Sequence, residues 1–170
     1  MIVNNVALEI EGMDKTGKDT IASYIGLLSN YKYTINVRGI LTQIVYNDKF
    51  NRNNDYVLPY IPFIVFLDVD NTDHAVRCSI TKEPKINIDK DREVYHAYID
   101  ELRKIGATVL EYNTSEMTPI QIAKDVINYL NTIDISDFIC MSPIYLTNLH
   151  KYTMEDLKNE DIFYKFEEET

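Results

Sequence analysis

The sequence predicts an α/β fold, a three-layer sandwich built on a small parallel sheet, followed by a C-terminal extension. Three observations predict it. An apolar, β-prone run at 6–10 passes through a glycine loop directly into a helical pattern, and strand-like and helical segments then alternate as far as residue 130. Residues 63–69 form an apolar run interrupted only by Asp68, which is typical of a strand covered on both faces. Because such alternation implies parallel β-α-β units, we expect a ligand at the carboxyl ends of the strands.

The first segment has the pattern of a phosphate-binding loop. Val6–Ile10 leads into Gly12-x-x-x-x-Gly17-Lys18 and then into a helix with apolar residues at helical spacing. The glycines let the backbone N–H groups converge on phosphate oxygens, the positive end of the helix dipole faces the same anion, and Lys18 adds a mobile charge. A plain glycine turn beside a surface lysine is the alternative, which the flanking strand and helix disfavour. The loop therefore predicts nucleotide binding by Gly12, Met13, Asp14, Lys15, Thr16, Gly17, Lys18, Asp19 and Thr20.

Two strands and a helix are predicted before residue 70. A short β-prone run spans 33–37, and a helical stretch spans 40–46, with Arg38-Gly39 between them. Residues 47–56 are polar and rich in asparagine, so we expect an exposed loop there. The apolar run at 63–69 predicts the buried strand.

Two helices are predicted next. The first spans 71–81, with Asn71 or Thr72 as its N-cap. Residues 82–85 break it, and the longest helical pattern of the chain follows at 89–105, with its apolar residues on one stripe.

A last strand is predicted at 107–112, after a glycine that ends the preceding helix. Thr118 is the predicted N-cap of a helix over 119–130, because a proline occupies the favoured first position. The sheet is therefore expected to contain four strands.

The alternation ends near residue 132, so we predict one domain over 1–132 and an extension over 133–170. The extension is rich in tyrosine and acidic toward its end, and Thr153–Asp156 has the pattern of a helix start. We expect it to be helical and to pack on the core or on a partner subunit, without a catalytic role.

The composition narrows the class of partner. The net charge of −10 argues against binding of long nucleic acid, although a nucleotide needs only a few local cations. The sequence contains no apolar run long enough to span a membrane and no signal pattern. Its cysteines and histidines are scattered, which disfavours a zinc site and favours a reduced, cytoplasmic protein.

With these elements in place, residues 4–131 resemble the thymidylate kinase branch of P-loop nucleotide kinases. Glu11–Lys18 is similar to that family's Glu-Gly-x-Asp-x-x-Gly-Lys loop. Phe66–Asp70 is similar to the strand before its lid, and the helical run from Asp91 is similar to the helix after the lid. Asn113–Thr118 occupies the place of the loop that contacts adenine. The resemblance implies a P-loop kinase-like fold and transfer of the γ-phosphoryl group of ATP to a deoxynucleoside monophosphate, with Mg²⁺.

The resemblance also implies roles for individual residues. Asp14 would meet the sugar hydroxyl of the acceptor, and Arg38 would correspond to the arginine of the family's Asp-Arg motif and contact the acceptor. Arg77 would correspond to the first arginine of the lid. Together with Lys15 and Lys18, these arginines would neutralise the charge that spreads over the transferred phosphoryl group. Plainer interpretations stay open, namely an ion pair for Arg38 and a solvated helix position for Arg77.

Three departures from the family pattern bear on activity. Asp19 replaces the serine or threonine that ligands magnesium, although Gly-Lys-Asp-Thr is similar to the loop of phage-type deoxynucleoside monophosphate kinases. The implied metal ligands are therefore Asp19 and Thr20. Val37 stands where the family has the aspartate of its Asp-Arg motif, and a strand and the acceptor-binding helices are missing before Arg38. The lid is also poor in cations.

Two other functions remain open at this stage. The trimmed acceptor region favours a nucleotide-binding protein with reduced or lost transfer, acting as a regulator or as a subunit of an assembly. A nucleoside kinase would need a carboxylate base near the acceptor hydroxyl, and Glu11 and Asp14 are the candidates. The base that is accepted stays open, as does a homodimer, which this branch commonly forms.

Overall fold

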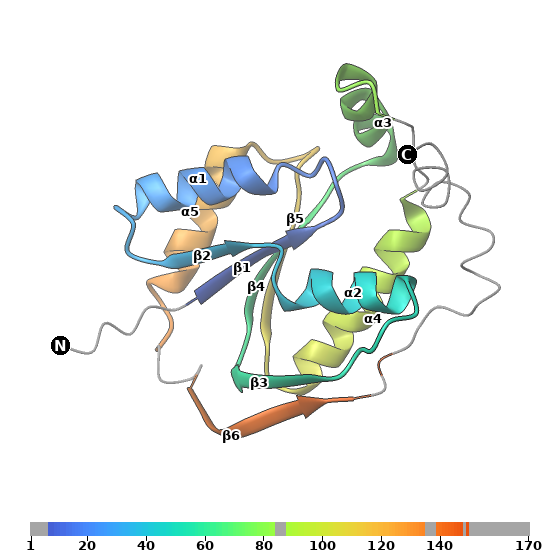
Figure 1. The fold of residues 1–170 in the computed structure, drawn as a ribbon. Helices are drawn as coiled ribbons and strands as arrows, with labels where there is room; N and C mark the ends of the chain where they lie inside the picture. Colours follow the sequence, from blue (N-terminus) through green and yellow to red (C-terminus); the bar gives the residue numbers. More distant parts are fainter. Residues whose placement is uncertain (1–6, 84–87, 135–138, 148, 150–170) are drawn as a thin grey trace.

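A four-stranded, fully parallel sheet forms the centre of the fold in this computed structural model, which describes residues 7–83, 88–134, 139–147 and 149 (Figure 1). The strand order is β2-β1-β4-β5. This sheet contains the four strands that the sequence predicts, with the bounds β1 Ala7–Gly12, β2 Thr34–Val37, β4 Phe63–Asp68 and β5 Thr108–Asn113.

Helices cover both faces of this sheet. On one face lie α1 (Lys18–Leu28) and α5 (Pro119–Leu130), and on the other lie α2 (Ile40–Lys49) and α4 (Asp89–Lys104) (Figure 1). Alternate residues of β4 enter the two cores: Phe63, Val65 and Leu67 pack with α1 and α5, whereas Ile64 and Phe66 pack with α2 and α4. The continuous apolar run is therefore buried on both sides, and the predicted three-layer sandwich is confirmed.

The helix boundaries follow local signals closely. Thr118 is the N-cap of α5, as predicted, and the structure adds a capping box with Gln121. The helix after β4, α3 (Asn71–Ile80), has Asp70 as its N-cap, so the predicted caps Asn71 and Thr72 are wrong by one or two residues. This helix lies beyond the carboxyl ends of the strands, apart from the two layers of helices (Figure 1).

Residues 47–56 differ from the predicted exposed loop. The helix α2 continues to Lys49, and Asp48, Lys49 and Asn54 are buried. Each of them has a distant partner: the Tyr98 hydroxyl donates to Asp48 at 2.6 Å, Lys49 pairs with Asp91 at 2.6 Å, and Asn54 donates to the carbonyl of Leu149 at 2.7 Å. The predicted exposure holds for residues 51–53 and 55, but Asp48 and Lys49 are buried and paired within the fold, and Oδ1 of the buried Asn54 lacks a hydrogen-bond partner among the described residues.

A second sheet, which the sequence analysis missed, joins β3 (Tyr56–Tyr60) and β6 (Ile139–Leu146) in antiparallel pairing. Its inner residues Leu58 and Leu146 pack on the α2–α4 core. The prediction of a helical extension is thus wrong for 139–146, because pairing with a strand some eighty residues earlier decides the conformation. The helix start predicted at Thr153–Asp156 lies outside the described residues.

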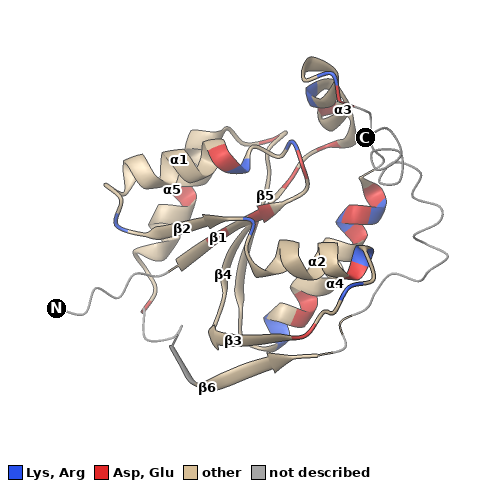
Figure 2. Cartoon of the chain, viewed as in Figure 1, with Lys and Arg blue, Asp and Glu red and all other residues tan. Residues whose placement is uncertain are grey.

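Acidic and basic residues alternate in the first turn of α4, and charged residues of both signs occur again near its end (Figure 2). Among the described residues, no helix combines the length and the apolar character needed to cross a membrane.

Candidate functional site

The glycine loop lies at the carboxyl end of β1, between the sheet and α3 (Figure 1). Gly12 has φ +144°, and a Cβ atom there would lie 2.3 Å from the carbonyl oxygen of Leu67 on the neighbouring strand. Gly17 has φ +85° and forms the N-cap of α1. Lys15 also has a positive φ, +63°, although it carries a side chain. The backbone therefore curls back on itself at three positions between β1 and α1.

Lys18 folds across this loop from the first turn of α1. Its ammonium group donates to the carbonyls of Gly12 at 2.9 Å and Met13 at 2.6 Å. The residue is only 6% exposed, and burial lowers the pKa of its amine from 10.5 to about 8, against the raising effect of Asp14. Because neutral loop carbonyls hold this buried cation, an anion that enters the loop can pair with it.

A cavity of about 360 Å³ opens beside the loop. Its walls come from the loop and the start of α1, from α3, from Thr114 in the β5–α5 connection, and from Pro119 at the start of α5. Four of the predicted nucleotide-binding residues line it, namely Lys15, Thr16, Gly17 and Thr20. The resemblance placed an adenine-contacting loop at 113–118, and Thr114 brings that segment to the same cavity.

Arg77 reaches this cavity from α3, but its guanidinium is already engaged. Nη1 donates to the carbonyl of Lys15 at 2.7 Å and to Oγ1 of Thr114 at 3.0 Å, and Nη2 donates to the carbonyl of Thr114 at 3.3 Å. The plain interpretation of a solvated helix position is therefore wrong. The Lys15 side chain pairs with Glu83 at 2.6 Å.

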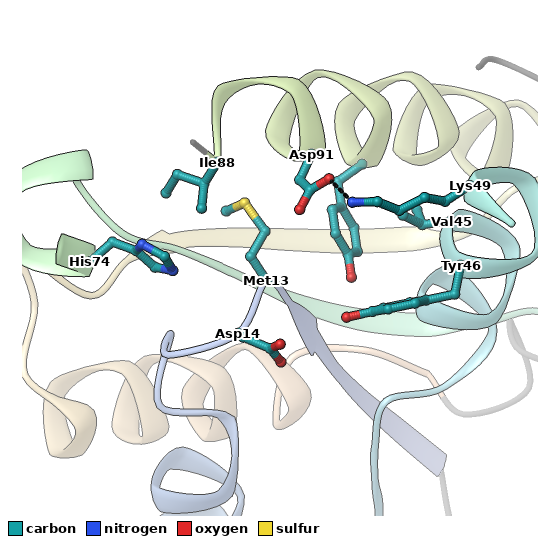
Figure 3. Close-up of a pocket in the computed structure, with 9 residues that line it drawn as sticks. Met13, Asp14, Val45, Tyr46, Lys49, His74, Ile88 and Asp91 are labelled. Atoms are coloured by element: carbon teal, nitrogen blue, oxygen red, sulfur yellow. Dashed lines mark hydrogen bonds and ion pairs between the residues drawn. The ribbon is translucent and has the colours of Figure 1, made fainter. Parts of the chain in front are cut away.

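A second, much smaller pocket of about 20 Å³ lies on the α2–α4 side of the loop (Figure 3). Asp14 faces it from the loop, His74 from α3, and the ion pair of Lys49 with Asp91 from the opposite wall (Figure 3). The Tyr46 ring forms part of the same wall, and desolvation raises the pKa of its hydroxyl to about 12.

Arg38 lies near the same pocket and pairs with Asp14 at 3.3 Å, with both side chains about half exposed. The structure thus brings together the two residues that the resemblance assigns to the acceptor, and it also supplies the ion pair of the plainer interpretation.

Two buried carboxylates that the sequence analysis left without a structural role hold the start of α2. Glu11 accepts from the N–H groups of Leu41 and Thr42 at 3.1 Å each and from the Thr42 hydroxyl. Glu9 accepts from the N–H of Ile40 at 3.2 Å, and a Cβ on Gly39 would lie 2.4 Å from the Glu9 carboxyl carbon. The sequence does contain a signal for this role, because two acidic residues alternate with apolar ones in a buried strand. Carboxylates buried on one face of a strand need hydrogen-bond donors from a neighbouring element.

Burial outweighs these donors and raises the pKa of Glu11 from 4.5 to about 7. Between these two values the folded protein holds a proton that the unfolded chain has released, so its stability falls as the pH rises through this window. We expect wild type to lose up to about 3 kcal/mol between pH 4.5 and 7 relative to Glu11→Gln. Urea unfolding at several pH values measures this. The exposed Glu116→Gln should follow wild type, and parallel curves for wild type and Glu11→Gln would contradict the assignment.

Arg92 makes several hydrogen bonds near the site, a role that the sequence analysis missed. Its Nε donates to both oxygens of Asp68, at 2.9 and 3.0 Å, and its Nη2 donates to the carbonyl of Val69 at 2.9 Å and to Oδ1 of Asn71 at 2.9 Å. Nη1 reaches Asp89 at 2.8 Å. Arg92 therefore ties the end of β4 to the starts of α3 and α4, which fixes the base from which α3 projects.

The predicted metal ligands Asp19 and Thr20 lie in the first turn of α1, and both are exposed. Thr20 lines the larger cavity. Within the described residues no group of three or more histidine, cysteine or acidic side chains is placed to hold a metal ion. One carboxylate and one hydroxyl fit a magnesium ion that takes its remaining ligands from phosphate oxygens and water.

A strand, a glycine loop and a helix at the carboxyl edge of a parallel sheet, with helices on both faces, define a P-loop kinase-like fold. Among solved structures, the chain is similar to the YorR protein of Bacillus subtilis, which was crystallised in complex with phosphorylated GDP. The two are 14% identical with a TM-score of 0.54, and the match covers 74% of this chain and 95% of YorR. At this identity the likeness shows a shared fold. No protein-family model and no curated protein matches the sequence.

Proposed function

We propose that this chain transfers the γ-phosphoryl group of ATP to a deoxynucleoside monophosphate, in the manner of the thymidylate kinase branch, with Mg²⁺ as cofactor. The observation that carries the proposal is the cavity of about 360 Å³ whose walls join the glycine loop to the β5–α5 connection. Its size falls in the range of small-molecule sites. The ligand of YorR, phosphorylated GDP, supports a nucleotide as the chemical class.

The chemistry at the loop suits phosphoryl transfer, which depends on positioning and on neutralisation of charge. Lys18 lies under the loop, and Lys15 and Arg77 line the cavity. Asp14 and Arg38 lie across the loop toward the smaller pocket, where the acceptor would bind. Donor and acceptor would then meet at the loop itself, with Asp19 and Thr20 holding magnesium against the phosphates.

A second candidate is a nucleotide-binding protein with reduced or lost transfer. The size of the pocket at Asp14 favours it, because about 20 Å³ holds no more than a water molecule. An acceptor could enter only after a movement of α2, α3 or α4. Val37 adds to this case, since it leaves Arg38 without the carboxylate that the family places beside it.

Purified protein incubated with ATP, Mg²⁺ and a panel of nucleosides and deoxynucleoside monophosphates separates these functions. Transfer to a deoxynucleoside monophosphate supports the proposed kinase. Transfer only to a nucleoside would show that the protein is a nucleoside kinase. Nucleotide binding without transfer to any acceptor supports the second candidate. Absence of nucleotide binding would contradict both.

Magnesium ligation gives a sharper test. If Asp19 is a metal ligand, Asp19→Asn should raise the Mg²⁺ concentration needed for half-maximal ATP binding by roughly tenfold, because a charged oxygen ligand is lost. Thr20→Val should raise it less, since a hydroxyl is a weaker ligand. The measurement is a magnesium titration at fixed ATP. A larger effect for Thr20→Val would assign the metal to the hydroxyl instead.

A further inference from the structure

The helix α3 contacts the glycine loop at consecutive residues, and these contacts go mainly to the backbone. Arg77 donates to the carbonyl of Lys15 at 2.7 Å. One turn earlier, the His74 ring makes a hydrogen bond with the main chain at Asp14, an interaction that opposes the lowering of its pKa by burial. Just after α3, Glu83 holds the Lys15 side chain at 2.6 Å. Residues 14 and 15 of the loop are thus attached to α3 and to the segment just after it.

The contact of Arg77 has a directional consequence. None of the described peptide bonds is cis, so the carbonyl of Lys15 and the N–H of Thr16 point in opposite directions within their peptide plane. Because the carbonyl turns out toward α3, the N–H turns inward, as an anion-binding loop requires. Lys15 has φ +63°, a conformation that costs a residue with a side chain roughly 1 kcal/mol and needs support from its surroundings.

The same Arg77 guanidinium also attaches to the carboxyl edge of the sheet. It contacts both the hydroxyl and the carbonyl of Thr114. Thr114 in turn donates to the carbonyl of Asp68 through its N–H at 2.9 Å and its hydroxyl at 3.0 Å. Arg77 therefore links the loop to the ends of β4 and β5 through a planar group that donates in two directions.

We infer that Arg77 is a positioning residue, which holds the Lys15 carbonyl against the sheet so that the Thr16 N–H faces the phosphates. This role differs from the direct phosphate contact that the resemblance implies for a lid arginine. It rests on the proposed function in so far as the loop binds a nucleotide. His74 and Glu83 assist by holding Asp14 and the Lys15 side chain.

The test compares four single variants and the double variant that combines Arg77→Met with Thr114→Val. Arg77→Met removes the link, whereas Arg77→Lys keeps the charge but not the planar fork. Thr114→Val removes one anchor, and Lys124→Met on α5 is the control for loss of a surface cation. Affinity for Mg²⁺-ATP and for tripolyphosphate is measured by titration calorimetry, and backbone order by amide hydrogen exchange at residues 13–17. A thermal melt checks that each variant folds.

We expect Arg77→Met and Arg77→Lys to weaken both ligands by a similar factor, roughly tenfold or more, and to speed exchange in the loop. Thr114→Val should act in the same direction but less, and should add little in combination with Arg77→Met. Lys124→Met should change neither quantity.

Near-wild-type affinity in Arg77→Lys alongside a large loss in Arg77→Met would overturn the inference, because charge alone would then suffice. Unchanged loop exchange in both Arg77 variants would overturn it as well. A third outcome is that the wild-type protein binds neither ligand, while loop exchange is still faster in the Arg77 variants. This outcome would support the positioning role and reject the proposed function, so the two failures are distinguishable.

Discussion

Lys18→Met should abolish measurable ATP binding, a loss of roughly a hundredfold or more, and leave the protein at least as stable as wild type. The loss follows because Lys18 is the buried cation beneath the loop, and methionine has similar length without charge. Titration calorimetry with Mg²⁺-ATP measures the loss. The exposed Lys124→Met serves as the charge control and should bind as wild type does.

The stability half of this prediction has its own physical basis. Burial lowers the pKa of Lys18 to about 8. At pH 7 the amine is charged in both states, and burying this charge on folding lowers the stability of the protein. This penalty is present below pH 8 and disappears as the pH rises toward 10.5, and methionine removes it at every pH. The carbonyls that Lys18 would leave keep other donors, because the Thr16 hydroxyl reaches Met13 at 2.8 Å and the Tyr95 hydroxyl reaches Gly12 at 3.4 Å.

Thermal and urea unfolding at pH 7 measure this balance. A gain of stability together with loss of binding would identify Lys18 as a residue retained for its charge. Unchanged affinity for ATP would contradict the phosphate-loop assignment altogether, and a collapse of the fold would show that the amine is mainly structural.

Gly12→Ala should destabilise the protein by about 3 kcal/mol or more, whereas Gly17→Ala should cost about 1 kcal/mol. At Gly12 the added Cβ would lie 2.3 Å from a carbonyl oxygen of β4, and φ is +144°. The oxygen belongs to the backbone of a central strand, so it yields only if the sheet distorts. At Gly17 nothing lies within 4 Å of the added atom, and only the positive φ opposes it.

The two variants form a matched pair, because both add one methyl group to the same loop at a residue with positive φ. Urea unfolding gives the two free energies. Equal losses would show that backbone strain, and not the approach of β4, dictates glycine at position 12. A small loss in both would mean that the loop relaxes freely.

The sheet and its helices were predictable because their signals are local. The capping box of Thr118, the apolar run of β4 and the helical spacing in α1 lie within a dozen residues, and each element follows from its own sequence. The same locality made the glycine loop recognisable, since the residues around an anion at a helix start are consecutive in the chain.

Other parts of the site join residues far apart, and local patterns carry little information about them. Arg77 meets Lys15 across sixty-two positions, Lys49 meets Asp91 across forty-two, and Glu11 meets Thr42 across thirty-one. In the sequence, each of these charged residues has the pattern of a surface charge or of an unexplained charge in the core. The tertiary structure shows the partner of each. The pairing of β3 with β6 was missed for the same reason.

The sequence by itself thus determined the layered architecture and the glycine loop, because hydrophobic periodicity and turn residues are properties of neighbouring positions in the chain. The tertiary structure alone decided how that loop is supported: from α3 through Arg77, from β4 through the close approach at Gly12, and beneath by a buried Lys18. Support of this kind depends on the packing of helices around the sheet, which brings distant side chains within hydrogen-bonding distance.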